Sequence, residues 1–209
     1  GCGKTTLARA LVRMIEIDEG KLFLDDNDVM DLKLKQLRSN IALVPQEGYL
    51  FTETLTENIR YGNPKASIEK VQESANEARM TDDIKGFPDG FKTLVGERGI
   101  TLSGGQRQRT ALSRALLVNS KIIVLDDALA SVDNKTASAI LQTIKSQYNK
   151  TVLMISHQLS AAASCDRILV MNEGKIVQEG THQFLIMKDG LYRSMWEREK
   201  AKEQLQSND

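Results

Sequence analysis

Short, mostly apolar runs alternate with amphipathic stretches along much of the chain. Apolar runs between polar or turn residues predict buried strands, and apolar side chains at helical spacing predict helices. The predicted strands are residues 21–24, 41–44, 122–126 and 151–155. The predicted helices are residues 4–17, 67–78, 103–118 and a stretch after Asp133. Strands that alternate with helices favour an α/β fold with a parallel sheet.

The stretch from residue 67 to residue 102 contains no clear buried strand in its sequence. It therefore predicts a helical lobe that is inserted into the α/β core. We expect one domain over residues 1–209, with a helical subdomain over about residues 67–118 inside it. No internal repeat and no low-complexity linker argues for a further division of the chain.

The last third of the chain predicts a hairpin and a terminal helix. Residues 167–171 and 175–179 flank Asn172-Glu173-Gly174, a sequence that is typical of a tight β-turn. Residues 191–209 begin with a helical pattern and become highly charged, so we expect a C-terminal helix and tail. No apolar run approaches the roughly 18 residues that indicate a membrane span.

Composition narrows the function classes. The chain has 209 residues, and 28 Lys and Arg balance 28 Asp and Glu, so the formal net charge is zero. Nucleic-acid-binding proteins usually carry a basic excess, which makes a nucleic-acid partner unexpected here. The two cysteines, Cys2 and Cys165, lie far apart without metal-ligand spacing. We therefore expect a reduced chain without a disulfide framework.

The chain begins Gly1-Cys2-Gly3-Lys4-Thr5-Thr6, the second half of the phosphate-binding sequence G-x-x-x-x-G-K-[ST]. Glycines let backbone N–H groups approach phosphate oxygens, the lysine contacts the β- and γ-phosphates, and the hydroxyl binds Mg²⁺. Lys4 and Thr5 fit these roles, and the amides of residues 2–6 form the cradle. By itself, half a motif is equally compatible with a glycine-rich turn. Since the chain opens inside the motif without an initiator methionine, we expect a fragment that lacks the N-terminal strands.

Asp126 ends the apolar run Ile122–Asp126. A P-loop ATPase needs a carboxylate at the end of a buried strand to hold Mg²⁺, and Asp126 supplies one. The alternative interpretation is that Asp126 caps a helix that follows the strand. Taken with the phosphate loop, the acid favours the ATP-binding interpretation more strongly than either feature does alone.

A second glycine-rich sequence, Leu102-Ser103-Gly104-Gly105-Gln106-Arg107-Gln108-Arg109, lies at the start of a predicted helix. Glycines are poor helix formers, so their presence indicates that another group comes close to the backbone. The N–H groups of a helix N-terminus attract anions, and Ser103 is a suitable N-cap. The sequence therefore predicts an anion site, against the alternative of a plain glycine-rich loop before a helix.

This second sequence resembles the signature of the ABC transporter ATPases, and the resemblance extends over nearly the whole chain. It implies a P-loop NTPase core that uses ATP and Mg²⁺. It also implies that the signature contacts the ATP of a second nucleotide-binding domain through Ser103, Gly104, Gly105 and Gln106. The implied Mg²⁺ ligands are Thr5, Gln46 and Asp126.

Further positions match family features. Gln46 resembles the glutamine that reaches Mg²⁺ and the attacking water, and His157 resembles the histidine near the γ-phosphate. A lone histidine is more often structural, and we expect His182 to be a surface residue at a helix start. Residues 49–61 resemble the surface that faces the membrane domain. Residues 96–99 resemble a loop that is typical of exporters and usually missing from importers.

One residue departs from the family pattern. Asp127 stands where active members usually carry a glutamate that polarises water. Its carboxylate is retracted by about 1 Å, and a misplacement of that size can cost about a hundredfold in rate. Ala130-Ser131-Val132-Asp133 also departs from the usual Ser-Ala-Leu-Asp. The chain thus resembles the degenerate subunit of heterodimeric bacterial exporters, although the retained Gln46 and His157 leave a homodimer open.

The resemblance implies partners as well as chemistry. We expect a transmembrane domain in the same polypeptide, a heterodimeric arrangement of two ATPase domains, and a location at the cytoplasmic face of the cell membrane. Alternatives are a soluble ABC ATPase that acts on nucleic acid or ribosomes, and an ATP-binding dimerisation module without hydrolysis. A P-loop kinase does not explain the signature. Drugs, lipids and peptides all remain open as transported substrates.

Overall fold

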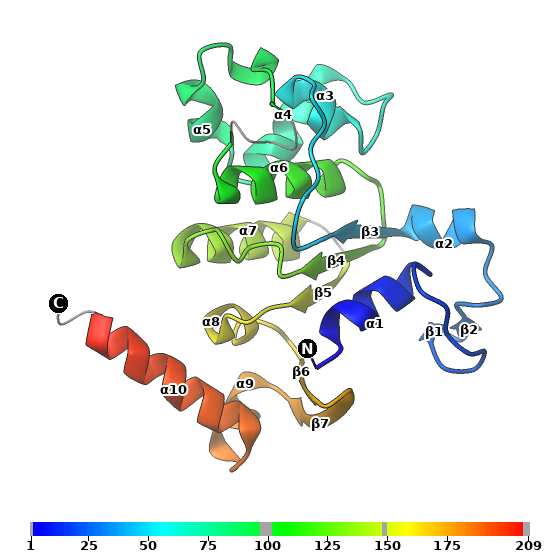
Figure 1. Ribbon diagram of the computed structural model, residues 1–209, viewed down its shortest axis with the longest axis vertical. Coiled ribbons are helices and arrows are strands. Elements are labelled where there is room, and N and C mark those ends of the chain that lie inside the picture. The colour runs from blue at the N-terminus through cyan, green and yellow to red at the C-terminus, as the bar shows by residue number, and fades with distance from the viewer. Residues whose placement is uncertain (1, 97–101, 148–149, 207–209) are drawn as a thin grey trace.

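A three-stranded parallel sheet forms the centre of the computed structural model, which describes residues 2–96, 102–147 and 150–206 (Figure 1). Its strand order is β3 (Ile41–Val44), β4 (Ile122–Asp126) and β5 (Thr151–Ile155). Ile41 pairs with Ile122, and Ile122 pairs with Thr151. The predicted α/β fold and the bounds of these three strands are confirmed.

Strand β4 is the central strand, and both faces of it are covered. Ile123 and Leu125 belong to the larger hydrophobic core, together with Ile140 and Ile144 of helix α7 (Asn134–Gln147). Val124, between them, points to the other face and packs in a second core. Helices α1 (Lys4–Leu11) and α2 (Leu34–Asn40) contribute to that second core. Burial on both faces explains why the strand is a continuous apolar run.

Helices gather at one end of the molecule (Figure 1). They are α3 (Leu55–Arg60), α4 (Ile68–Glu77), α5 (Thr81–Gly86), the 3₁₀ helix η1 (Gly90–Lys92) and α6 (Gly104–Leu116). The sequence did not predict α3, which is capped by the Thr54 side chain. The division into a helical subdomain over about residues 67–118 stays a prediction, since α3 packs against α6 but precedes residue 67.

Two short antiparallel pairs flank the core. Strand β1 (Phe23–Leu24) covers the second half of the strand predicted over residues 21–24, and it pairs with β2 (Asn27–Asp28), which the sequence did not predict. Strands β6 (Ile168–Asn172) and β7 (Lys175–Gly180) form the predicted hairpin. Glu173 and Gly174 at its tip have φ angles of 47° and 76°, as a two-residue turn between twisted strands requires.

The C-terminal part contains helices α8 (Leu159–Ala162), α9 (His182–Met187) and α10 (Leu191–Gln206). His182 begins α9 as expected, but it is half-buried rather than a plain surface residue. Its Nδ1 lies 2.8 Å from the Tyr192 hydroxyl, and its ring packs edge-on against Trp196. The histidine thus joins α9 to α10 through a small aromatic cluster.

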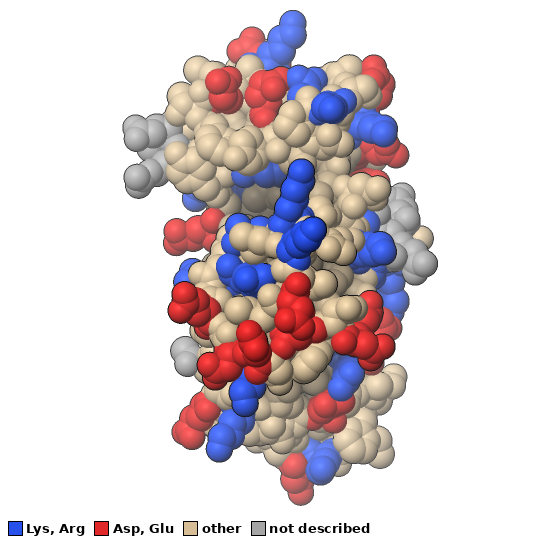
Figure 2. All heavy atoms as spheres, turned by 90° about the vertical axis from the view of Figure 1, so that its right-hand side faces the viewer, with Lys and Arg blue, Asp and Glu red and all other residues tan. Residues whose placement is uncertain are grey.

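The surface carries both signs of charge. Figure 2 shows acidic and basic side chains together from top to bottom of one face, in keeping with the balanced composition. Within the residues that the structure describes, no helix combines the length and the apolar character needed to cross a membrane.

Candidate functional site

The phosphate-loop sequence leads directly into helix α1. Gly3 is the N-cap residue of this helix, with a φ of 94°, a left-handed conformation that glycine adopts without steric cost. Lys4, Thr5 and Thr6 form the first turn. Gly1 lies outside the described residues. The loop therefore presents the backbone N–H groups of a helix start, which favour an anionic ligand.

The Thr5 hydroxyl donates a hydrogen bond of 2.9 Å to Oδ1 of Asp126. This contact joins the first turn of α1 to the end of β4, where Asp126 is only 4% exposed. Mg²⁺ is typically bound by one or two carboxylates together with substrate phosphates. Within the described ranges, no group of three or more His, Cys, Asp or Glu side chains is placed to hold a metal. The Thr5 hydroxyl beside the buried Asp126 carboxylate fits an Mg²⁺ ion that is also bound by the phosphate oxygens of a nucleotide.

Lys4 contacts Cys2 within the phosphate loop. Its Nζ donates to Sγ of Cys2 over 3.2 Å. This hydrogen bond and the charge of the ammonium lower the pKa of the Cys2 thiol, against the opposing effect of burial. The thiol is thus a more acidic group than an ordinary cysteine and sits beside the predicted phosphate site.

Three strands end at the same edge of the sheet, and each is followed by a predicted catalytic residue. Gln46 follows β3, Asp127 follows β4, and His157 follows β5. The Asp127 N–H donates to the Ile155 carbonyl over 2.9 Å, which ties the loop after β4 to the end of β5. Ligands of open α/β sheets bind at the carboxyl ends of the strands, so this edge is the expected place for chemistry.

These residues differ in exposure and backbone conformation. Gln46 and His157 are exposed, whereas Asp127 is half-buried. Asp127 has a φ of 51°, in the left-handed region where aspartate and asparagine are enriched over other non-glycine residues. A glutamate at this position gains no such local advantage, so the backbone itself favours the shorter acid.

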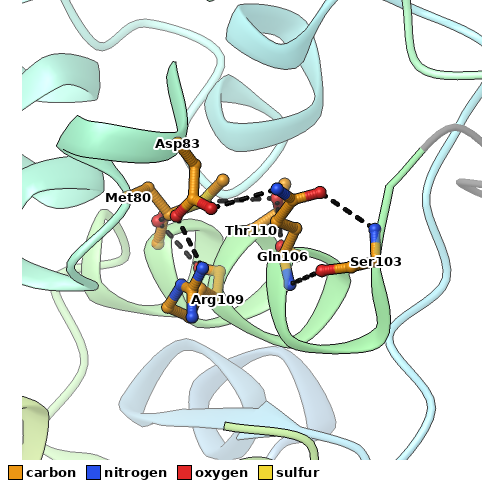
Figure 3. A network of polar contacts seen from close by, with 7 residues as sticks. Met80, Asp83, Ser103, Gln106, Arg109 and Thr110 are labelled. Carbon is orange, nitrogen blue, oxygen red and sulfur yellow. Dashed lines mark hydrogen bonds and ion pairs between the residues drawn. The ribbon is translucent and has the colours of Figure 1, made fainter. Parts of the chain in front are cut away.

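The signature starts helix α6 with a capping box (Figure 3). The Ser103 Oγ accepts from the Gln106 N–H over 3.2 Å, and the Gln106 Oε1 accepts from the Ser103 N–H over 2.9 Å. The Gln106 Nε2 donates to Oδ1 of Asp83 over 3.0 Å, while Oδ2 of Asp83 pairs with Arg109. Both the oxygen and the nitrogen of the Gln106 side-chain amide are therefore hydrogen-bonded to residues of the same chain.

The two signature glycines have a packing role that the sequence did not reveal. A Cβ atom on Gly105 would lie 2.8 Å from the Ser131 carbonyl oxygen, and one on Gly104 would lie 3.2 Å from the Ser131 side chain. The first distance is too short for any side chain without movement of the backbone. Ser131 thus packs directly against the signature glycines. Gly105 is needed for this approach, whereas a Cβ on Gly104 requires the Ser131 side chain to move by a few tenths of an ångström.

Gln108 is a residue that the sequence analysis missed. It is 7% exposed, and its Oε1 accepts from the Ser131 N–H over 2.8 Å. Its Nε2 donates to the Gln46 carbonyl over 3.4 Å. One signal could have revealed it, because Gln108 shares a helix face with Ala111 and Leu112, where a polar residue is unexpected. The side chain links the signature helix to two of the loops around the site.

A groove of about 600 Å³ lies in the region predicted to face a membrane domain. It is lined by Phe51, Thr52, Glu53, Glu57, Arg60, Tyr61 and Pro64. The Arg114 guanidinium of α6 lies 5.5 Å from the ring centre of Phe51 and 5.3 Å from that of Tyr61. Burial lowers the pKa of Arg114. The exporter-like sequence at residues 96–99 falls, apart from Gly96, outside the described residues.

Comparisons with known proteins agree on one family. Residues 1–130 match a family model described as ABC transporter. ABC transporter B family member 24, mitochondrial, of Arabidopsis thaliana is 42% identical over 203 residues, which cover 97% of this chain and 30% of that protein. The ATP-dependent lipid A-core flippase of Chromobacterium violaceum is 42% identical over 193 residues, 92% of this chain and 33% of the flippase.

A solved structure gives the same result for the fold. It is described as a bacterial Atm1-family ABC exporter with ATP bound, and it has 39% sequence identity and a TM-score of 0.91. The match covers 95% of this chain and 35% of that one. The chain therefore spans about a third of the length of the proteins it resembles.

Proposed function

Because the chain belongs to the ABC transporter family and is its ATPase domain, we propose that it is the motor of a membrane exporter, driven by ATP binding and hydrolysis. The observation that carries this proposal is the Thr5–Asp126 hydrogen bond, which joins the phosphate loop to the carboxylate at the end of β4. It lies at the sheet edge from which Gln46 and His157 also extend. The site thus combines the groups that hold a nucleotide with groups that can orient water.

Each residue has a defined role in this proposal. The amides of residues 2–6 and Lys4 bind the phosphates, and Thr5, Gln46 and Asp126 hold Mg²⁺. The ion, when bound, offsets the negative charge of the phosphate oxygens. Gln46 and Asp127 orient the attacking water, and His157 contacts the γ-phosphate.

The signature acts on a second domain. Two ATPase domains associate head to tail, so that Ser103, Gly104, Gly105 and Gln106 complete the site of the partner. The support is local: Ser103 is exposed at the start of α6, where helix N–H groups favour an anion. The capping box and the hydrogen bond to Asp83 stabilise this helix start.

The two sites of the assembled motor are unequal. Asp127 is shorter than the usual glutamate, and its left-handed backbone conformation favours this residue. We therefore place slow hydrolysis at this chain's own site and fast hydrolysis at a glutamate-bearing site of a partner chain. In this heterodimer, the chain described here supplies an intact signature to the ATP site of the partner chain.

Substitutions of the acid in the complete transporter test the asymmetry. Asp127→Asn in this chain should leave most of the ATPase activity, whereas Glu→Gln at the matching position of the partner should leave only the slow hydrolysis of this chain's own site. Asp127→Glu should raise turnover at this site. If Asp127→Asn abolishes activity as fully as the change in the partner, the two sites are equivalent and the heterodimer proposal fails. A transporter that binds ATP without hydrolysing it would indicate a dimerisation module.

The membrane partner is a transmembrane domain of the same polypeptide, which places this domain at the cytoplasmic face of the cell membrane. The groove beside residues 49–61, lined by aromatic and charged side chains, supports a protein contact there. We propose no nucleic-acid partner, since acids accompany the basic side chains on the face shown in Figure 2. Nucleic-acid binding by the complete protein that weakens steeply with salt would contradict this assignment.

A further inference from the structure

Glu199 of helix α10 makes a contact that the proposed roles do not use. Its two carboxylate oxygens each accept from the Leu159 N–H over 3.1 Å. Oε1 also accepts from the Ser160 N–H over 3.2 Å. Glu199 is half-buried, whereas Glu197 on the same helix is exposed and pairs with Arg193. A side chain near the end of the chain therefore binds the first turn of α8.

Helix α8 needs this outside acceptor. It has only four residues, and its N-cap residue Gln158 makes no side-chain cap hydrogen bond. The first N–H groups of a helix have no partner within the helix, so they require acceptors from elsewhere. A carboxylate is a strong acceptor for them, because the charge and the helix dipole both favour the contact. Glu199 is thus the cap of α8, supplied from 40 residues away.

The capped turn begins two residues after His157. The loop Ser156–Gln158 has β5 before it and α8 after it. At its start, the Ile155 carbonyl accepts from the Asp127 N–H over 2.9 Å. At its end, Glu199 holds the amides of Leu159 and Ser160. Both ends of the histidine loop are therefore fixed by residues that are distant in the sequence.

We propose that Glu199 is a positioning residue for His157, which makes helix α10 part of the ATPase site. The proposal rests on the proposed role of His157 at the γ-phosphate. When the cap is lost, the amides of α8 lose their acceptor and the end of the loop is released. His157 then samples several positions, and the fraction of time that it spends in the productive one falls.

The experiment uses the complete transporter with its partner chain, in which Glu→Gln at the position of the partner that matches Asp127 silences the fast site, so that the remaining hydrolysis reports on this chain's own site. Glu199→Ala removes the acceptor, Glu199→Gln keeps one oxygen that can accept, and Glu197→Ala is the matched control. We expect Glu199→Ala to lower the kcat of this chain's own site by about 10- to 100-fold, since a misplacement of about 1 Å has an effect of that order. The KM for ATP should change less than twofold. Glu199→Gln should lie between wild type and Glu199→Ala, and Glu197→Ala should match wild type.

A second substitution separates positioning from a general structural effect. In a His157→Ala background, with rates measured under single-turnover conditions, Glu199→Ala should cause no further loss. An equal loss in both backgrounds overturns the proposal, as does a wild-type kcat for Glu199→Ala or a matching loss of ATP affinity and turnover. Failure of the proposed function has a different signature, because the wild-type transporter then shows no ATP hydrolysis at all.

Discussion

The hydrogen bonds of the Gln108 side chain allow a prediction that concerns one short segment of the chain. We consider the substitution Gln108→Met, which keeps a long unbranched side chain and removes both hydrogen bonds. The Oε1 bond to the Ser131 N–H has a length of 2.8 Å. The Nε2 bond to the Gln46 carbonyl is 3.4 Å long, near the limit for a hydrogen bond, so it contributes less. The main effect should therefore appear at Ser131.

The size of the effect follows from what replaces the lost acceptor. Ser131 is exposed as a residue, so we expect water to replace Gln108 as the acceptor of its N–H. The net value of an exchanged hydrogen bond, about 0.5–1.5 kcal/mol, therefore applies rather than the larger cost of a buried unsatisfied group. Opening of this segment becomes easier by that amount. Amide exchange at Ser131 should accelerate by about 2- to 12-fold, since 1.4 kcal/mol corresponds to a factor of ten.

Hydrogen exchange of the complete transporter, followed by mass spectrometry of peptides that span residues 127–134, measures this effect. Gln72→Met is the matched control, because Gln72 is exposed on helix α4. The control should leave the exchange of these peptides unchanged. Wild-type exchange in Gln108→Met would refute the reasoning, and so would equal acceleration in every peptide of the domain, which indicates general destabilisation.

Two further predictions concern the loops around the nucleotide. Gly105→Ala should lower the ATPase rate of the complete transporter about tenfold or more, because its Cβ would lie 2.8 Å from a backbone oxygen. Gly86→Ala, where a Cβ meets no atom within 4 Å, should keep the wild-type rate. Alkylation of Cys2 should accelerate at a lower pH than that of an ordinary cysteine, because the contact with Lys4 lowers its pKa. Cys165, whose pKa is raised by burial, should react more slowly at the same pH, and equal rates measured by mass spectrometry would contradict both assignments.

The sheet could be predicted from the sequence because its strands are buried on both faces. Ile122–Asp126 is apolar at adjacent positions, which a half-exposed strand or an amphipathic helix does not require. The helix start at Ser103 could also be predicted, since the capping residue and Gln106 follow a local rule. Local rules of this kind need no knowledge of the tertiary structure.

Other elements depend on contacts that no local pattern contains. The first helix was predicted to continue to residue 17 but ends at Leu11. Arg13 has a φ of 51°, and its guanidinium donates to the Leu32 carbonyl over 2.8 Å. Ile17 packs in the same core as the helix, which explains why the apolar spacing continued past its end. Helix α3 has only six residues, too few for a periodic pattern to emerge.

The candidate site divides in the same way. The meeting of Thr5 with Asp126 follows from the roles of the two motifs, and the structure shows it directly. The contacts of Gln108 and Glu199 could not be predicted, because a glutamine or a glutamate on a helix does not reveal its partner. Glu199 binds amides about 40 residues away along the chain.

The parallel sheet also has a consequence for how the domain folds during its synthesis. Among the residues that the structure describes, β3 pairs with β4 alone, and Ile41 meets Ile122 about 80 residues later in the chain. At a synthesis rate of about 5–20 residues per second, β4 is synthesised roughly 4–16 s after β3. During that time the apolar residues of β3 lack their native ladder, and such unpaired strands invite aggregation. Helices α3 to α6 are synthesised in this interval. The helical part of the domain can therefore form before β3 and β4 pair.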